Sequence, residues 1–293
     1  MEYKGVMVLA EQGEGKLHPI SFELLGKGRE IADKLGVALS CVLLGSEIKA
    51  EASELICHGA DKVFLYDHPS LKDFDALCYK QNIVNLVQEE LPEILLIGAT
   101  PLGKSLSPRV AVALETGLTA DCIDLAIDED GSLIQVRPAF MGRIFAYMKT
   151  ATRPQLSTIR YKAMQPMERD PNRKGNIIEK EAVISSDSRV KIVGERKAKE
   201  ANISDANIIV SCGRGLKGPE DFPLIEELAR LLGGALGVSR PLVDEGWIGK
   251  EHQVGFSGNT VKPKLYIACG ISGAPQHLAG MKSSDIIVAI NTD

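Results

Sequence analysis

The sequence predicts an α/β protein of two domains in which helices cover parallel sheets. Up to about residue 120, short apolar runs alternate with amphipathic stretches, as in strands joined by crossover helices. The same alternation restarts after residue 203. Aromatic residues make up only 5% of the 293 residues, so the core must come mainly from Val, Ile, Leu and Ala, which suit buried parallel strands.

In the first domain, four apolar runs of strand length predict strands over residues 5–10, 37–44, 62–66 and 94–97. Apolar residues at helical spacing predict helices between them, over 22–35, 48–56 and 79–90, and a further helix that includes 110–114. Pro92 ends the third of these helices, because proline cannot continue a helix.

The segment that follows reads as extended chain with turns. Strands are expected over 122–128, 133–137 and 144–148, with Glu129-Asp130-Gly131 as a hairpin turn. The stretch 167–202 is polar and charge-rich, and we expect one more edge strand near Ala182–Ile184 and then a linker. The domain boundary is placed between residues 195 and 203. It separates a scaffold domain, 1–198, from a second domain, 203–293.

The second domain contains a helix candidate at 223–232 and four strand candidates at 208–211, 235–239, 265–269 and 286–290. The short crossovers between them favour a small parallel sheet.

Charge and composition argue against several classes of function. The net charge of −5 offers no global basic surface for nucleic acid or an anionic membrane. The longest apolar runs are far shorter than the roughly 20 residues of a membrane span, and the N-terminus does not resemble a signal peptide. Six cysteines without a CxxC pair, Cys122 among them, predict buried thiols in a reducing compartment, so a cytoplasmic protein is expected.

A glycine-rich turn follows the first strand of the second domain, at Gly213, Gly215 and Gly218. A dinucleotide fingerprint requires this context, but Glu220 and Asp221 would place negative charge where a pyrophosphate must bind. The next strand ends in Ser239-Arg240 instead of the acidic residue that binds a ribose diol. The turn therefore favours the approach of a ligand other than NAD.

The carboxyl ends of parallel strands meet at one sheet edge, where ligands of open α/β sheets bind. Here the expected strand ends and the nearby loops bring two arginines, several glycine-loop amides, serines and a histidine to that edge. This set suits a large cofactor that carries phosphate groups.

Several long motifs carry a family resemblance. GRGL (213–216), GVSRPLVDEGW (237–247), QVGFSGNTVKPKLYIACGISGAPQHLAGM (253–281) and IVAIN (287–291) resemble the FAD-binding domain of electron-transfer flavoprotein alpha subunits. GATPLGKSLSPRVAVALETGLTADC (98–122) and RPAFMG (137–142) are similar to the first domain of the same subunit. The resemblance implies a Rossmann-like, deoxyhypusine-synthase-like FAD-binding domain. It also implies that the first domain is a scaffold and an interface for a beta subunit.

The resemblance also implies roles for individual residues. Arg240 would lie against the isoalloxazine and favour an anionic reduced flavin, Ser257 would bind near N5, and His277 would donate towards the pyrimidine carbonyl. The implied cofactor-binding set is Arg214, Ser239, Arg240, Gln253, Val254, Gly255, Phe256, Ser257, Gly258, Ser272, Gly273, Ala274, Pro275, Gln276, His277 and Asn291. No catalytic residue and no metal ligand is predicted.

The sequence departs from the common family pattern at three places. Phe256 stands where glutamine is frequent, Pro275 replaces an aliphatic residue, and the chain ends at Asp293. Since the family's alpha subunit continues with about one more strand and helix, we expect a C-terminally shortened FAD domain.

The function implied is that of an electron carrier in a heterodimer with a beta subunit, and whether it is an enzyme in its own right stays open. Its FAD would relay electrons between an acyl-CoA dehydrogenase type partner and other carriers, with Gly194–Asn202 as the hinge of a swinging domain. A second mode is flavin-based electron bifurcation, in which NADH and ferredoxin also exchange electrons with the complex. The alternatives are a stand-alone NAD-dependent enzyme of deoxyhypusine-synthase-like fold and a nucleotide-sensing interaction protein.

Overall fold

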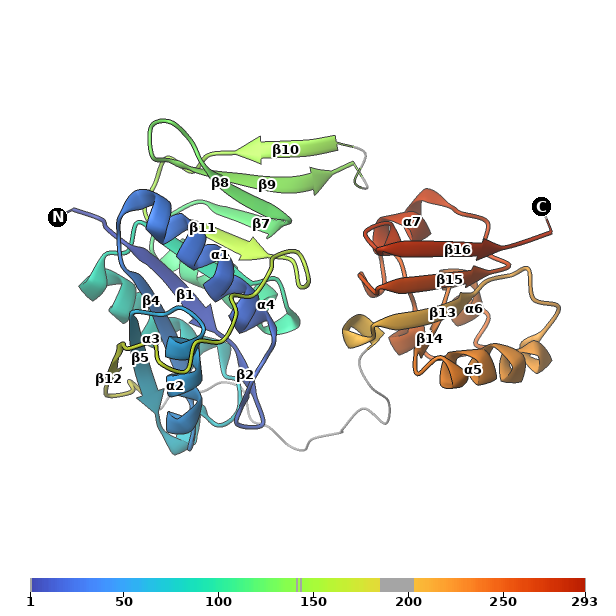
Figure 1. Cartoon of the computed structure of the whole chain (residues 1–293), viewed down its shortest axis with the longest axis horizontal. Helices are drawn as coiled ribbons and strands as arrows, with labels where there is room; N and C mark the ends of the chain where they lie inside the picture. The colour runs from blue at the N-terminus through green and yellow to red at the C-terminus, as the bar shows by residue number, and fades with distance from the viewer. Residues whose placement is uncertain (1, 141, 143, 185–202, 293) are drawn as a thin grey trace. The chain divides into compact units, whose positions relative to one another are not determined.

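A computed structural model describes residues 2–140, 142, 144–184 and 203–292, which form two compact units (Figure 1). The N-terminal unit holds 2–139 and 144–184. The C-terminal unit holds 203–292, and residues 140 and 142 group with it. Each unit contains a parallel sheet with helices, which confirms the predicted α/β class. The expected boundary and the expected hinge at Gly194–Asn202 fall on residues 185–202, outside the described residues.

The N-terminal unit is built on a seven-stranded sheet in the order β12-β5-β4-β1-β6-β11-β7. Every neighbouring pair in it is parallel. Its strands are β1 (Val6–Ala10), β4 (Leu39–Gly45), β5 (Lys62–Asp67), β6 (Ile94–Gly98), β7 (Leu118–Cys122), β11 (Gln155–Ile159) and β12 (Asn176–Glu179).

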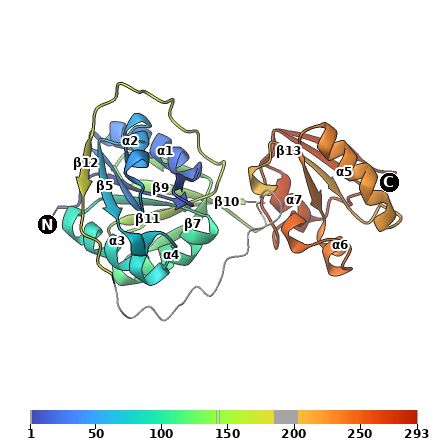
Figure 2. The ribbon, with the colours of Figure 1, turned by 90° about the horizontal axis from the view of Figure 1, so that it is seen from below.

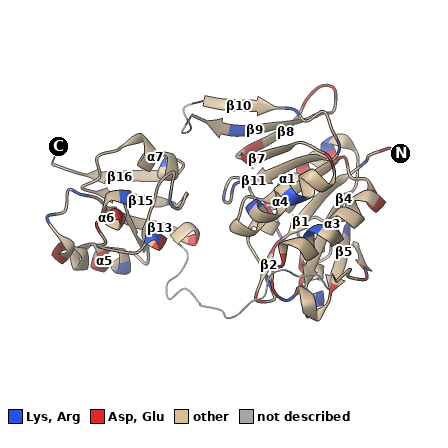
Figure 3. Cartoon of the chain, turned by 180° about the vertical axis from the view of Figure 1, so that it is seen from behind, with Lys and Arg blue, Asp and Glu red and all other residues tan. Residues whose placement is uncertain are grey.

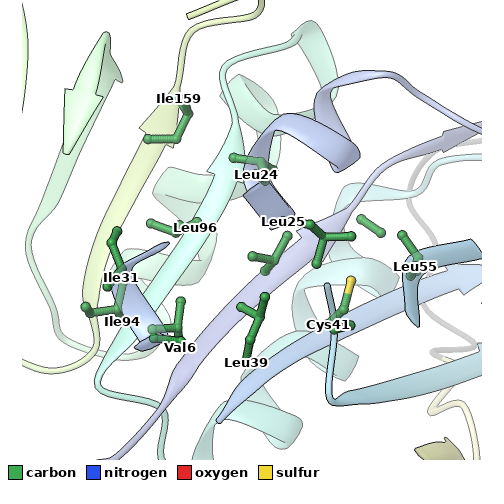
Figure 4. Packing of buried hydrophobic residues seen from close by; sticks show 14 of the residues in the cluster. Val6, Leu24, Leu25, Ile31, Leu39, Cys41, Leu55, Ile94, Leu96 and Ile159 are labelled. Carbon is green, nitrogen blue, oxygen red and sulfur yellow. The ribbon is translucent and has the colours of Figure 1, made fainter. Parts of the chain in front are cut away.

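Helices cover both faces of this sheet, and alternate residues of each strand feed the two cores. Val6 and Val8 of β1 pack with α1 (Ile20–Leu35) and α2 (Lys49–Cys57), in the cluster seen in Figure 4. Met7 and Leu9 pack on the opposite face with α3 (Ala76–Glu90) and α4 (Pro101–Ala113). The sheet is thus buried on both faces, which explains its nearly continuous apolar strands.

The N-terminal unit also contains a short hairpin of β2 (Gln12–Gly13) and β3 (Lys16–Leu17). It further contains a small antiparallel sheet in the order β10-β9-β8. Its strands are β8 (Asp124–Ile127), β9 (Leu133–Ala139) and β10 (Ile144–Met148). The predicted hairpin turn joins β8 to β9, and Gly131 in it has a φ of 78°. β10 is an edge strand with most of its side chains exposed.

One strand prediction in this region is wrong, and another differs from the structure in its bounds. Residues 181–184 form no strand, because the Asn82 side chain takes both backbone groups of Val183, at 2.8 Å and 2.9 Å. The strand that joins the sheet edge there is β12, which pairs with β5. The segment expected as one strand over 122–128 is divided between β7 and β8, which belong to different sheets.

The C-terminal unit has a four-stranded parallel sheet in the order β14-β13-β15-β16. The strands are β13 (Ile208–Cys212), β14 (Ala235–Val238), β15 (Leu265–Cys269) and β16 (Ile286–Ile290). The helices are α5 (Phe222–Leu231), α6 (Arg240–Asp244) and α7 (Pro275–Met281). One core joins the sheet to α5 and α6 and the other joins it to α7, so the helices lie on opposite faces (Figure 2).

Positions of basic and acidic residues are interspersed along the backbone of each unit in the view of Figure 3. Within the described part of the chain, every helix is too short or too polar to cross a membrane. Cys122, the last residue of β7, is fully buried, and burial raises the pKa of its thiol to about 12, which makes it a poor nucleophile.

Candidate functional site

The C-terminal unit contains a cavity of about 630 Å³ at the carboxyl ends of its parallel strands. Arg214 follows β13, Ser239 follows β14, Gly270 follows β15 and Asn291 follows β16. The volume lies within the range of roughly 300–1,000 Å³ for small-molecule and cofactor sites. The cavity is lined by Arg214, Gly215, Ser239, Arg240, Pro241, Asp244, Gln253, Val254, Gly255, Phe256, Ser257, Gly270, Ile271, Ser272, Ala274, Gln276, His277 and Asn291.

Both arginines at this edge lie close to carboxylates. Arg240, the first residue of α6, places Nε 3.1 Å from Asp244 Oδ2 one helical turn later. Arg214 Nη1 lies 3.0 Å from Glu245 Oε1. The Arg214 and Arg240 side chains are 67% and 65% exposed, so each pair stabilises the fold weakly but lowers the net positive charge offered to a ligand.

The loop after η4 (Lys250–His252) folds tightly against α7 and supplies one wall of the cavity. Its backbone is held by hydrogen bonds from Val254 N to Val238 O, at 2.9 Å, and from Phe256 N to Gln276 O, at 2.8 Å. Gly255 has a φ of 147°, which favours glycine. A Cβ on Gly280 of α7 would lie 2.5 Å from the Gly255 backbone, so this close approach requires glycine there too.

Within this loop, Gln253 orients Ser257. Gln253 is buried, and its Nε2 donates to Ser257 Oγ at 3.0 Å. Since the Ser257 oxygen already accepts this bond, its own hydrogen is available to donate to an acceptor in the cavity. This arrangement is compatible with the role near flavin N5 that the family resemblance implies for Ser257.

His277 lies in α7 and is only 7% exposed. Its Nε2 is 2.9 Å from the hydroxyl of Tyr266 on β15. Its Nδ1 is buried and has no hydrogen-bond partner of good geometry among the described residues. Burial lowers the pKa of His277 and the nearby Val254 backbone carbonyl only partly opposes this shift, so the ring is neutral near pH 7. A buried polar atom without a partner at a cavity wall indicates a place for a ligand group.

Gly213 and Gly215 of the 213–218 turn allow this turn to pack closely against the loop that begins at Gly270. A Cβ on Gly213 or Gly215 would lie 2.6 Å or 2.5 Å from the backbone of Gly270, which itself has a φ of 60°. Asp221 then accepts from Lys217 N and precedes α5, so its carboxylate lies at the helix start. The turn therefore lacks the bare helix N-terminus on which a dinucleotide fingerprint depends.

Three residues of the predicted set do not line the cavity, and five lining residues were missed. Gly258 turns inward, where a Cβ would lie 2.5 Å from Gln253 O. Gly273 and Pro275 lie beside the lining residues, and Pro275 is the first residue of α7, where its missing N–H breaks no helical bond. The missed residues are Gly215, Pro241, Asp244, Gly270 and Ile271, all neighbours of the predicted strand ends. Whether the predicted residues bind FAD stays a prediction.

Comparison with known proteins gives consistent results for both units. The family model for the electron transfer flavoprotein domain matches residues 6–185, and that for the electron transfer flavoprotein FAD-binding domain matches residues 202–282. The chain is 49% identical to an electron transfer flavoprotein subunit alpha of Thermoanaerobacterium thermosaccharolyticum, over 99% of this chain and 89% of that protein. It is 47% identical to the subunit alpha of Megasphaera elsdenii, over 100% of this chain and 88% of that protein. It is also 43% identical to the lactate dehydrogenase (NAD(+),ferredoxin) subunit LctC of Acetobacterium woodii, over 99% of this chain and 70% of that protein.

Proposed function

Because the chain belongs to the electron transfer flavoproteins, as an alpha subunit that binds FAD, we propose that it relays electrons between a dehydrogenase and other redox carriers. The observation that carries the proposal is the cavity at the strand ends of the FAD-binding unit. It combines arginines, loop amides and a buried histidine at one sheet edge. The relatives give no support to a stand-alone NAD-dependent enzyme.

The residues of the cavity fit FAD. Among the described residues the buried Nδ1 of His277 makes no hydrogen bond of good geometry, and a flavin carbonyl would supply an acceptor. Arg214 and Arg240 supply positive charge for phosphate groups or for a reduced anionic ring. When bound, FAD takes up and releases electrons, which no side chain of the cavity can do.

The protein's own residues would bind and orient the cofactor. The Gln253 amide donates to the Ser257 hydroxyl oxygen. The hydroxyl hydrogen of Ser257 therefore points away from Gln253. His277 would donate from Nδ1, which makes no hydrogen bond of good geometry within the described part of the chain, and Arg240 would set the local charge.

We also propose that the N-terminal unit contacts a beta subunit, and that β10 contributes to this interface. Ile144, Phe145, Tyr147 and Met148 are 50%, 53%, 71% and 45% exposed on this edge strand. Since successive side chains of a strand point to opposite faces, both faces of β10 expose apolar groups. An unpaired edge with this composition is typical of a protein interface.

Replacing Phe145 and Tyr147 together with serine is expected to weaken binding of the beta subunit at least tenfold, because exposed aromatic residues at interface centres often contribute more than about 1.4 kcal/mol each. Co-purification with a tagged beta subunit and sedimentation of the complex measure this effect.

Val112→Ser is the matched control, since Val112 is an apolar residue of α4, away from β10 in the sequence, and is 79% exposed. It should bind the beta subunit as the wild type does. If the β10 double variant also binds with wild-type affinity, β10 lies outside the interface.

The LctC relative favours a second mode for the relay, because its name couples NAD⁺ with ferredoxin. We propose that this chain works in a complex of the same kind, in which NADH, ferredoxin and an acyl-CoA dehydrogenase type flavoenzyme exchange electrons through flavins. The cytoplasmic location expected from the cysteine pattern stays a prediction.

Adding NADH anaerobically to the purified heterodimer tests this mode. Bleaching of the flavin absorbance by NADH alone, with ferredoxin reduced only when the acyl-CoA dehydrogenase and its substrate are also present, is the expected result for bifurcation. A flavin that NADH leaves oxidised, but that a reduced dehydrogenase bleaches, would support the simple carrier instead. A heterodimer that neither donor reduces would overturn the proposed relay.

A further inference from the structure

Tyr266 and His277 form a buried hydrogen-bonded pair beside the FAD cavity. Tyr266 is fully buried on β15, and its hydroxyl lies 2.9 Å from Nε2 of His277. Only His277 lines the cavity, so Tyr266 cannot touch the cofactor directly. Tyr266 lies within the strand predicted over 265–269, and the family resemblance implies no role for it in the site.

The pair shares hydrogens in one of two ways. If the phenol donates to Nε2, the neutral ring carries its hydrogen on Nδ1. If Nε2 donates to the phenol, Nδ1 is a bare acceptor and the phenol hydrogen needs another partner. The packing around Tyr266 is mainly apolar, with Ile209, Val254 and Met281 in the same cluster, so an unpaired phenol hydrogen would be costly there.

We infer that Tyr266 is a positioning residue that holds His277 in the tautomer with its hydrogen on Nδ1, so that His277 donates from Nδ1 to a carbonyl acceptor of the flavin. The inference rests on the proposed function, because it requires a flavin in the cavity. It accounts for the buried Nδ1, which makes no hydrogen bond of good geometry to any described residue and becomes a donor fixed in place before the ligand arrives.

The ionisation of the pair agrees with this arrangement. Burial raises the pKa of Tyr266 above its ordinary value, and the nearby Ser211 hydroxyl on β13 partly opposes this shift. Burial lowers the pKa of His277. Both groups are therefore neutral near pH 7, so the pair holds one phenol hydrogen and one imidazole hydrogen.

The tautomer can be read directly from ¹⁵N spectra of the wild-type heterodimer labelled with ¹⁵N-histidine. The signal of His277 is the one that disappears in His277→Gln. We expect a protonated Nδ1 and an unprotonated Nε2. The opposite assignment, or a ring protonated on both nitrogens at pH 7, would overturn the inference, and this measurement needs no variant of Tyr266.

The second test is Tyr266→Phe, which removes only the hydroxyl. Because the Nδ1–H tautomer is then no longer enforced, the dissociation constant of FAD should rise about threefold to tenfold, the effect of one hydrogen bond. The flavin midpoint potential should move to a more negative value, since His277 would no longer stabilise charge on the reduced ring. Tyr79→Phe is the matched control. Tyr79 is also buried and its hydroxyl bonds to Leu44 O and Leu71 O, but it lies in the N-terminal unit.

A double variant distinguishes a role of Tyr266 in positioning His277 from a role in the stability of the fold. In the His277→Gln background, Tyr266→Phe should change FAD affinity less than twofold, because its effect acts through His277. An unchanged dissociation constant and potential in Tyr266→Phe, or an effect equally large without His277, would overturn the inference. Absence of FAD from the wild-type complex would instead overturn the proposed function, and the ¹⁵N spectra would still decide the tautomer.

Discussion

Replacing Gly280 with alanine is expected to weaken FAD binding by about 10- to 100-fold. The added Cβ would lie 2.5 Å from both N and Cα of Gly255, which are backbone atoms and cannot rotate away. Overpacking of this kind typically costs about 1–3 kcal/mol, and each 1.4 kcal/mol corresponds to a factor of ten in affinity. The displaced segment is the loop from Val254 to Ser257, which forms one wall of the cavity.

The expected loss of FAD affinity in Gly280→Ala is opposite in sign to the effect that helix propensity alone would give. Alanine is the better helix former by about 1 kcal/mol, so Gly280→Ala in a helix without the Gly255 contact should stabilise the protein. Gly13→Ala is the matched control, since a Cβ at Gly13 meets no atom within 4 Å. FAD content by absorbance and the dissociation constant by flavin fluorescence measure the outcome. Wild-type FAD affinity in Gly280→Ala would show that the loop and α7 separate without affecting the site.

The sequence predicted best those strands whose residues are apolar throughout. β15 and β16 begin and end where the apolar runs do, because Gly270 and Asn291 interrupt the pattern directly after them. β11 was not singled out, although it lies inside the seven-stranded sheet. Its polar residues Gln155, Ser157 and Thr158 are buried, which a pattern of hydrophobicity cannot anticipate.

The partners that make β11 possible come from distant parts of the chain. Gln155 accepts from Leu133 N at 2.9 Å, and Ser157 accepts from Gln135 Nε2 at 2.7 Å. Thr158 accepts from Asp121 N at 2.9 Å. These bonds offset the cost of burying the polar side chains, but they exist only once the small antiparallel sheet has folded against β7.

The location of the candidate site was predictable for a related reason. Parallel strands bring their carboxyl ends to one edge, so the residues after each apolar run gather there whatever the details of the loops. The sequence does not predict Asp244 as a site residue, because an acidic residue in a short polar segment has no periodic pattern. Its contact with Arg240 depends on the single turn of α6.

The charge of Arg240 is expected to set the flavin potential. Arg240→Gln should lower the one-electron midpoint potential by about 40–90 mV, because a guanidinium near a reduced, anionic ring in a partly exposed site contributes about 1–2 kcal/mol. Asp244→Asn should shift the potential in the opposite direction and by less, about 20–40 mV, since it removes the carboxylate that offsets Arg240 across 3.1 Å. Spectroelectrochemical titration of the heterodimer measures both values.

Opposite signs for these two variants identify charge as the cause. Both substitutions break the same ion pair in α6, so a purely structural effect of losing that pair would move the potential in one direction for both. Arg240→Lys is the control that keeps the charge, and it should retain most of the wild-type potential. Raising the ionic strength should shrink both shifts, because the two side chains are 65% and 59% exposed and mobile ions screen them. Shifts of the same sign, or shifts that salt leaves unchanged, would place Arg240 away from the flavin ring and assign its effect to the packing of α6.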